Sequence, residues 1–264
     1  MLLSSTRHAL PRLAATALLL LTLSACATTQ TADSRDPFEP INRVSYAVND
    51  GLDRALVKPA AKVYKTVMPQ FVQTGVSNVF SNAKYPVTLV NNALQGKFGA
   101  AANDAGRFLL NSTVGLGGLL DPATAAGLDR NDEDFGQTFG VWGIGPGPYF
   151  VIPLFGPTTL RDGFGSIADD FAEPRSYLKD SRTRWSLWAV DKFETRVRLL
   201  DADTVLERSG DPYAFVRSAY LQRREFQVRD GNMPAEDLEA EFAEDEDAEP
   251  AAEPPPTPRP IRLL

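Results

Sequence analysis

The chain has little of what most enzyme active sites are built from. Its 264 residues include one cysteine, Cys26, and one histidine, His8. A single cysteine cannot form an internal disulfide, so packing must hold the fold together. Ser-His-Asp and Cys-His nucleophilic sites need a histidine, and so do histidine-rich zinc sites. His8 lies in an amino-terminal segment that we expect to be removed, so the mature chain lacks all three kinds of site.

An apolar run of membrane-spanning length is also missing. The run from Leu13 to Leu23 has eleven residues, whereas a helical span needs about 20. It follows Arg7 and Arg12 and ends in Leu-Ser-Ala, directly before Cys26. A basic start, a short apolar run and small residues before a cleavage point are the features of a secretory signal.

Cys26 is placed like the cysteine of a lipoprotein signal. A cysteine directly after Leu-Ser-Ala resembles the lipobox of bacterial lipoproteins, which implies cleavage before Cys26. The resemblance also implies diacylglycerol on its sulfur and an acyl chain on its new amino group. Ala27 follows, where an Asp usually marks retention at the inner membrane, so we expect the outer membrane. The alternative is a cysteine that serves only as a small apolar residue.

Positive charge is scarce, and the negative charge is unevenly distributed. The net charge is -7, yet residues 234–264 alone hold ten acidic and two basic side chains. The rest of the chain is therefore nearly neutral and lacks the basic surface that nucleic acid requires. An acidic, proline-rich tail cannot bury enough apolar surface to order itself, so we expect disorder there.

The chain therefore divides into a short exported leader, one body and a tail. About 200 residues suit one domain with a sizeable core. We expect a lipoprotein signal peptide over residues 1–25, a linker to the lipid anchor over 26–35, a helical domain over 36–231 and a disordered tail over 232–264.

The body reads as an all-α domain. Most of its segments carry apolar residues at helical spacing, for example Ile41, Val44 and Val48. Capping and proline signals mark several boundaries. They predict helix starts at Asp36-Pro37, Pro69, Pro86 and Asp211-Pro212, and helix ends at Gly96 and Gly231.

Glycine and aromatic residues gather between Gly115 and Gly165, where twelve of the 19 glycines fall. This composition predicts a long loop, and long loops in compact domains are often functional. Aromatic side chains on glycine hinges would form a mobile apolar surface. The string from Gly143 to Pro148 is similar to a phosphate loop, but its prolines remove amide donors, so we expect no nucleotide there.

The acidic clusters fit no catalytic or metal site. The cluster from Asp129 to Asp134 lacks the glycine and glutamate spacing of an EF-hand. Asp169 and Asp170 are adjacent on a predicted helix and point apart, which favours a capping or surface role over a catalytic pair. We expect no enzyme, no metal and no cofactor apart from the acyl and diacylglycerol groups on Cys26.

Several long motifs in the body resemble the MlaA family, also called VacJ lipoproteins. The resemblance covers nearly the whole of residues 36–231 and excludes the tail. The motifs are DPFEPINR (36–43), PVTLVNNALQG (86–96), DAGRFLLNSTVGLGGLLDPA (104–123), DFGQTFGVWGIGPGPYFVIPLFGPTTLRDGFG (134–165) and ETRVRLLDADTVLERSGDPY (194–213).

The resemblance implies a fold and a function. The family fold is a ring of amphipathic interfacial helices around an amphipathic channel, embedded mainly in the inner leaflet of the Gram-negative outer membrane. Family members are anchored by lipid on the periplasmic side and bind trimeric porins. They remove phospholipids that have strayed into the outer leaflet and pass them to the periplasmic carrier MlaC. We therefore expect retrograde lipid transport that maintains outer-membrane lipid asymmetry.

For such a transporter, the glycine-rich segment Phe135–Phe155 is our candidate gate. We expect Phe135, Phe139 and Trp142 to face lipid tails. Flexibility at the glycines would let the segment swing at low cost.

Three polar residues are further candidates. Arg161 and Asp162 face a lipid headgroup, or they form an internal salt bridge that holds the loop. Asn42 holds the loop and the ring together, or it is a simple amide on a helix surface.

Two other functions are open to the sequence. The first is a structural lipoprotein that braces porins or the envelope without transport. The second is a lipid hydrolase, which the lack of histidine disfavours because nothing replaces the base.

We predict that Cys26→Ala leaves the protein unanchored. Each buried methylene of an acyl chain contributes about 0.8 kcal/mol to membrane attachment, so losing every chain should move the protein to the soluble fraction. Cell fractionation measures this, and the intact mass of the wild-type protein should show the acyl groups. An unmodified thiol on the mature wild-type Cys26 would contradict the anchor.

Overall fold

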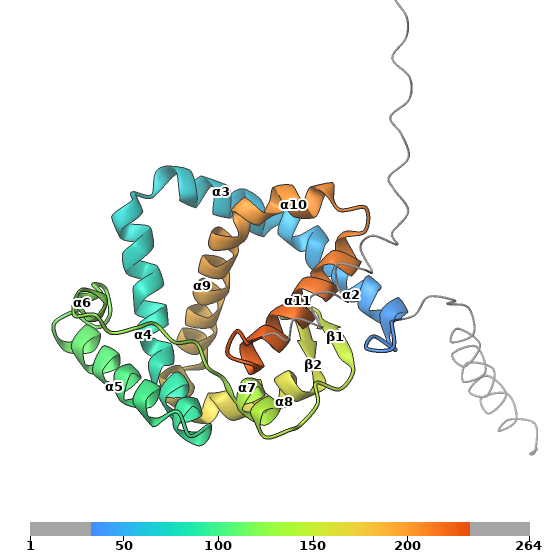
Figure 1. Ribbon diagram of the computed structural model, residues 1–264. Helices are drawn as coiled ribbons and strands as arrows, with labels where there is room; N and C mark the ends of the chain where they lie inside the picture. Colours follow the sequence, from blue (N-terminus) through green and yellow to red (C-terminus); the bar gives the residue numbers. More distant parts are fainter. Residues whose placement is uncertain (1–32, 233–264) are drawn as a thin grey trace, which may run out of the picture.

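The computed structural model describes residues 33–232, and Figure 1 shows the helices of this part arranged as a ring that α9 crosses. Cys26, the signal segment and residues 233–264 of the tail lie outside the described residues. The elements in chain order are α2 (Glu39–Leu52), the π-helical turn η2 (Asp53–Val57), α3 (Lys58–Val67), α4 (Gln70–Leu94), α5 (Phe98–Thr113), α6 (Pro122–Ala125), α7 (Phe135–Val141), β1 (Tyr149–Ile152), β2 (Gly156–Thr159), α8 (Leu160–Ala172), the 3-10 turn η3 (Pro174–Tyr177), α9 (Ser181–Leu199), the 3-10 turn η4 (Leu200–Ala202), α10 (Asp203–Arg208) and α11 (Pro212–Val228).

The prediction of a single all-α domain is confirmed, with one small hairpin added. Helices α4 and α5 pack along each other at one side of the ring, and α7 packs on α8 at the bottom. Helix α3 runs across the top and contacts α9, which lies between α4 and α11 (Figure 1). The helices therefore surround a central region without filling it by a layered core.

Several predicted helix boundaries are correct. Pro69 directly precedes α4, and Gly96 follows its end with a φ of 79°, a left-handed conformation that glycine adopts easily. Asp211 caps α11, because its carboxylate accepts hydrogen bonds from the backbone N–H groups of Tyr213 and Ala214.

Two predicted helix starts are wrong. Pro86 does not begin a helix but lies inside the continuous α4. A proline in a helix interior costs about 3 kcal/mol. The packing of α4 against α5, with buried residues on both sides of Pro86, offsets that cost. Asp36 is not a helix cap either, since α2 begins at Glu39 and the Asp36 carboxylate accepts a hydrogen bond from Asn42.

The glycine-rich stretch has more regular structure than the loop we predicted. It contains α6, α7 and an antiparallel hairpin in which Tyr149 faces Thr159 and Ile152 faces Gly156. Leu154, at the tip of the hairpin, has a φ of 69°. Alternation of side chains over four-residue strands is too short a pattern to distinguish from a loop.

The distribution of polarity in the described residues is inverted. Ten hydrophobic residues are buried, against 17 polar or charged ones, and 37 large hydrophobic residues are exposed. The one hydrophobic cluster of buried residues consists of Tyr149, Val151, Tyr213 and Leu221. Within residues 33–232, none of the helices has the length and apolarity needed to cross a membrane.

Arg107, on α5, is the largest of the fully buried side chains in residues 33–232, with 1% of its surface exposed. Its Nε donates to the Tyr85 hydroxyl at 2.6 Å, and its Nη2 donates to both carboxylate oxygens of Asp121 at 2.8 and 3.0 Å. Its Nη1 donates to the backbone carbonyl of Leu128. One guanidinium thus ties α4, α5 and the α6 region together.

We predict that Arg107→Met destabilises the fold by about 3 to 5 kcal/mol, because it leaves the Asp121 carboxylate without its buried partner. Arg130→Met is the matched control, since Arg130 binds the same carboxylate from the surface, with 59% of its side chain exposed. A surface pair contributes at most about 1 kcal/mol. Thermal unfolding in detergent micelles measures both variants, and equal shifts would contradict the role of Arg107.

Candidate functional site

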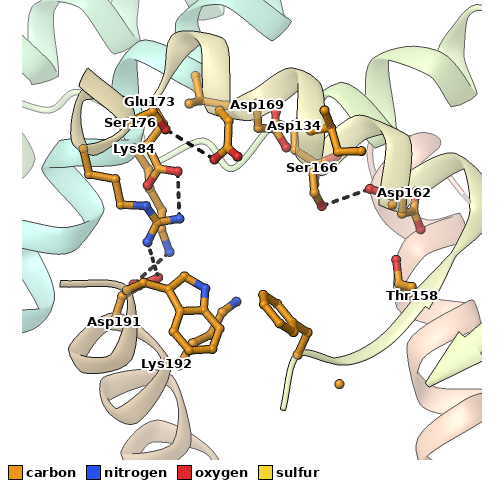
Figure 2. A pocket seen from close by; sticks show the side chains of 18 of the residues that line it. Lys84, Asp134, Thr158, Asp162, Ser166, Asp169, Glu173, Ser176, Asp191 and Lys192 are labelled. Carbon is orange, nitrogen blue, oxygen red and sulfur yellow. Dashed lines mark hydrogen bonds and ion pairs between the residues drawn. The ribbon is translucent and has the colours of Figure 1, made fainter. Parts of the chain in front are cut away.

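A cavity of about 1020 Å³ lies inside the ring. Its walls come from α4, α8, α9 and α11, together with the hairpin, η3 and the residues before α7. Figure 2 shows charged and hydroxyl side chains along its border. A cavity of this size is at the upper end of the range for small-molecule sites.

The wall of the cavity is amphipathic. Its charged residues come from every surrounding helix, and an apolar group lies mainly on α8, α9 and the hairpin. The apolar residues are Val87, Ile152, Phe155, Pro157, Ile167, Phe171, Trp185 and Trp188. The charged residues are Lys84, Asp132, Glu133, Asp134, Asp162, Asp169, Asp170, Glu173, Arg175, Arg184, Asp191, Lys192 and Arg224.

Arg224, on α11, holds one side of the cavity together. Its guanidinium donates to Asp134 at 2.7 and 2.9 Å and to Asp162 at 2.9 and 3.0 Å. Asp134 also caps α7 by accepting a hydrogen bond from the N–H of Gln137 at 2.8 Å. Burial raises the pKa of both carboxyls, but the hydrogen bonds and charge of Arg224 outweigh it and hold each pKa below its usual value. The cluster joins α7, α8 and α11.

Arg161 and Asp162 form an internal ion pair. The Nε of Arg161 donates to Asp162 at 3.0 Å, and 8% and 6% of their surfaces are exposed. Asp162 borders the cavity, whereas Arg161 does not. Of the two arrangements that the sequence allowed, the structure contains the internal salt bridge.

Asp169 has the most strongly perturbed carboxyl of the cavity wall. Burial raises its pKa to about 7, and the nearby charge of Asp134 adds to the rise. Its carboxylate accepts a hydrogen bond from the backbone N–H of Phe135 at 2.9 Å. Figure 2 shows Asp169 and Asp134 on the same side of the cavity, away from Lys192.

The predicted gate residues are not in the cavity wall. Phe135 and Phe139 lie on α7, a helix in place of the loop that we expected, and Trp142 directly follows the last residue of that helix. Their rings follow one another at centroid distances of 6.0 and 6.1 Å. Trp142 donates to the carbonyl of Leu94 at 3.3 Å. The structure brings these three rings together.

Another aromatic contact borders the cavity instead. Phe155, at the hairpin tip, packs on Trp188 of α9 with ring centroids 5.0 Å apart, and Trp188 contacts Trp185 at 5.8 Å. Phe155 is the last residue of the segment we predicted, but the sequence reasoning missed its partner on α9. The two residues are 33 positions apart, and no local pattern connects them.

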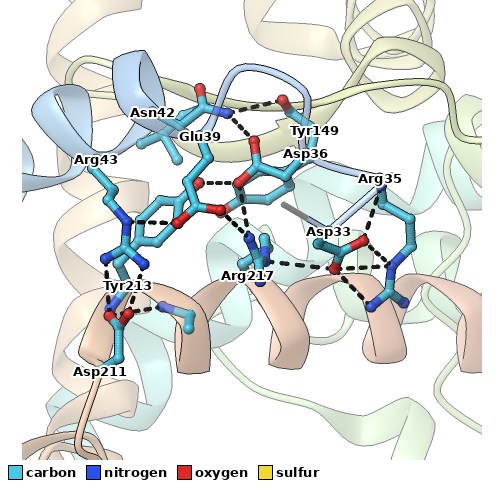
Figure 3. A network of polar contacts seen from close by, with 12 residues as sticks. Asp33, Arg35, Asp36, Glu39, Asn42, Arg43, Tyr149, Asp211, Tyr213 and Arg217 are labelled. Atoms are coloured by element: carbon cyan, nitrogen blue, oxygen red, sulfur yellow. Dashed lines mark hydrogen bonds and ion pairs between the residues drawn. The ribbon is translucent and has the colours of Figure 1, made fainter. Parts of the chain in front are cut away.

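Asn42 is buried and joins α2 to the hairpin (Figure 3). Its Nδ2 donates to the Tyr149 carbonyl at 3.0 Å, and its Oδ1 accepts from the N–H of Val151 at 2.9 Å. Asn49, two turns further along α2, does the same at the tip: it donates to the Ile152 carbonyl and accepts from Leu154.

The two amides complete the hydrogen bonding of strand β1. One edge of β1 pairs with β2, so its other edge would present unpaired backbone groups. Asn42 and Asn49 supply the missing donors and acceptors from a helix. The spacing of seven residues, which puts both on one helical face, is the signal that could have identified Asn49 from the sequence.

Asp36 anchors the segment before α2 to α11. Its carboxylate accepts hydrogen bonds from Asn42 at 2.7 Å, from Arg217 at 3.1 Å and from the hydroxyl of Tyr213. Figure 3 shows these groups converging on one buried carboxylate. The Asp36 carboxylate therefore connects α2 to α11.

No group of three or more His, Cys, Asp or Glu side chains in residues 33–232 is arranged to hold a metal ion. The acidic residues before α7 are engaged elsewhere, for example Glu133 with Lys97 and Gln95.

We predict that Asp169 makes the fold less stable as pH rises. Its native pKa of about 7 is higher than the 3.8 of an ordinary Asp, so the native state binds more protons than the unfolded state between these values. Stability therefore falls as pH rises from about 4 to about 7 and then levels off. Asp169→Asn should lack this contribution, so its advantage in unfolding midpoint over wild type should grow across that range. Thermal unfolding at stepped pH measures this, and a constant difference would contradict it.

Comparison with known proteins places this architecture among lipoproteins. A family model described as MlaA lipoprotein matches residues 34–227. The "Intermembrane phospholipid transport system lipoprotein MlaA" of Escherichia coli (strain K12) is 37% identical over 246 residues, covering 89% of this chain and 96% of that protein. The protein of the same name from Haemophilus influenzae is 32% identical over 220 residues, covering 80% and 88%.

A solved structure shows the same fold. It was described under "Structural basis for maintenance of bacterial outer membrane lipid asymmetry", and it is 38% identical with a TM-score of 0.68. The similarity covers 73% of this chain and 98% of that one. The matched family model and the extent of these similarities show that the chain belongs to the MlaA lipoprotein family.

Proposed function

We propose that this protein removes mislocalised phospholipids from the outer leaflet of the outer membrane and passes them to a periplasmic carrier. The observation that carries the proposal is a charged cavity inside a body whose exterior is apolar. The names of the relatives, which refer to an intermembrane phospholipid transport system, support it.

The apolar exterior supports a position in the membrane. Exposed apolar residues follow the outer faces of consecutive helices, such as Ile41 and Val44 on α2 and Val63 and Val67 on α3. Water is an unfavourable neighbour for so large an apolar surface. Helices too short to span can lie in one leaflet with their apolar faces in lipid. Acyl groups on Cys26 would hold the ring there, on the periplasmic side.

The cavity offers a phospholipid headgroup an alternative to hydrocarbon. A charged headgroup loses its hydration when it enters an apolar phase, at a cost of several kcal/mol or more. Charged side chains such as Lys192 and Asp170 replace that hydration along the wall. The aromatic side, with Phe155 and Trp188, suits the acyl tails. Movement down a lipid gradient needs no nucleotide, and opening at the Phe155–Trp188 contact would admit the tails.

The partners belong to the same proposal. An outer-membrane porin trimer would hold the ring in place, and the periplasmic carrier MlaC would receive the lipid. The two alternative functions, a structural brace and a lipid hydrolase, make different demands on the cavity from those of transport. A brace between porins or in the envelope does not need an open cavity, and a hydrolase would need a catalytic base.

We predict that filling the cavity stops lipid removal. Ser166 lines the cavity on α8 (Figure 2), so Ser166→Trp should occupy the path. Cells with this variant should accumulate outer-leaflet phospholipid and become sensitive to detergent. Ser186→Trp is the matched control, because Ser186 is exposed on α9 and outside the cavity wall. It should behave as wild type.

The two variants separate transport from bracing. Outer-leaflet lipid is measured by labelling intact cells, and the amount of each variant in the membrane by fractionation. If Ser166→Trp is present at normal levels and the lipid composition stays normal, transport through this cavity is wrong and the structural role is favoured.

A further inference from the structure

The charges of the cavity wall are not all neutralised by one another. Five of the acids form ion pairs with bases: Asp134 and Asp162 with Arg224, Glu133 with Lys97, Glu173 with Arg175, and Asp191 with Lys84. These ion pairs hold the wall together, and the charge of each paired acid is neutralised by its partner. The remaining charged groups determine what the cavity binds.

The unpaired cations lie on α9. In the part of the chain that the structure describes, the Lys192 ammonium and the Arg184 guanidinium line the cavity and have no hydrogen-bond or ion-pair partner. The acid beside Lys192, Asp191, is already bound by Lys84 at 3.0 Å and lies 3.9 Å from Arg175. Loss of hydration lowers the pKa of Lys192, although the charge of Asp191 opposes the shift. A cation without a partner in such a wall favours an anion.

The acids of the wall that have no ion-pair partner come from other elements than α9. Asp132 precedes α7, and its carboxylate has no partner among residues 33–232. Asp170, on α8, accepts one long hydrogen bond of 3.4 Å from Ser176. Figure 2 shows the α8 side, marked by Asp169, across the cavity from Lys192. The free charge of the wall is therefore divided, with cations on α9 and carboxylates on α8 and before α7.

We propose that the cavity selects a zwitterionic phospholipid headgroup, with its phosphate toward Lys192 and Arg184 and its amine toward Asp132 and Asp170. This inference rests on the proposed function and names the lipid class that the function would prefer. An ethanolamine headgroup carries both charges that the divided wall complements. A glycerol headgroup satisfies the cations only.

The test is a competition between two lipids. The full-length acylated protein, purified in detergent, is incubated with vesicles of equal parts phosphatidylethanolamine and phosphatidylglycerol. Lipid bound to the re-purified protein is measured by mass spectrometry. We expect phosphatidylethanolamine to be enriched about fivefold, a factor that corresponds to about 1 kcal/mol. N-acetylated phosphatidylethanolamine, which lacks the positive charge, should bind like phosphatidylglycerol.

Variants of each wall should change binding differently. Lys192→Gln should reduce binding of both lipids, because both carry the phosphate, and Lys192→Arg should restore it. The double variant Asp132→Asn with Asp170→Asn should abolish the preference and still bind phosphatidylglycerol. Lys179→Gln and Asp129→Asn, which lie outside the cavity wall, are the matched controls and should behave as wild type. Equal unfolding midpoints establish that the variants are folded.

The outcomes distinguish this inference from the function beneath it. Wild-type protein that binds no phospholipid would overturn the proposed function and the inference with it. Binding of both lipids in the vesicle ratio would overturn the inference alone. A preference for phosphatidylethanolamine that survives in the double variant would also overturn the inference alone, because the two carboxylates would then not bind the headgroup amine.

Discussion

The structure depends on polar contacts in places where a soluble protein has a hydrophobic core. Arg224 binds Asp134 and Asp162, and through them it fixes α7, α8 and α11 around the cavity. Taking such charges out of water is costly, and the mutual attraction repays the cost only when every group is well partnered. Here the guanidinium donates four hydrogen bonds to the two carboxylates. The ring can remain open inside because these directional bonds, and not the filling of space, hold its helices.

The hairpin is the clearest consequence. A two-stranded hairpin alone is at best marginally stable, and this one is supported on one side by the buried cluster that Tyr149 and Val151 form with Tyr213 and Leu221. Its position follows from Asn42 and Asn49, which complete the free edge of β1 from α2. Asp36 fixes α2 in turn through Asn42 and connects it to Arg217 on α11. The aromatic tip therefore reaches α9 from a support built of amides and carboxylates.

Helix boundaries were predictable where the signal is local. Asp211 caps α11 and Gly96 ends α4, and in both cases all the interacting groups are close together in the sequence. Apolar residues at helical spacing predicted the all-α fold, and the family resemblance added the ring arrangement. The predictions that were wrong depend on contacts between residues far apart in the sequence. Pro86 sits inside α4 because packing against α5 outweighs its lost hydrogen bond. Phe155 meets Trp188 only after the ring has formed, so no spacing in the sequence marks that contact. The burial of 17 polar residues is also invisible to apolar periodicity, which assumes apolar residues face inward.

Because polar residues face inward and apolar residues face outward, the charged residues fall into two classes with different roles. A charged side chain with a full set of partners fixes the positions of the helices it joins, because its hydrogen bonds are directional. The charges of its partners cancel its own field. Arg107 and Arg224 are of this kind. A charge without an ion-pair partner keeps its field and is available to a ligand. Lys192, on α9, and Asp170, on α8, are of this second kind, although Asp170 accepts one long hydrogen bond from Ser176. In a protein that handles amphiphiles, the paired charges thus set the shape of the path, and the unpaired ones set which headgroup can follow it.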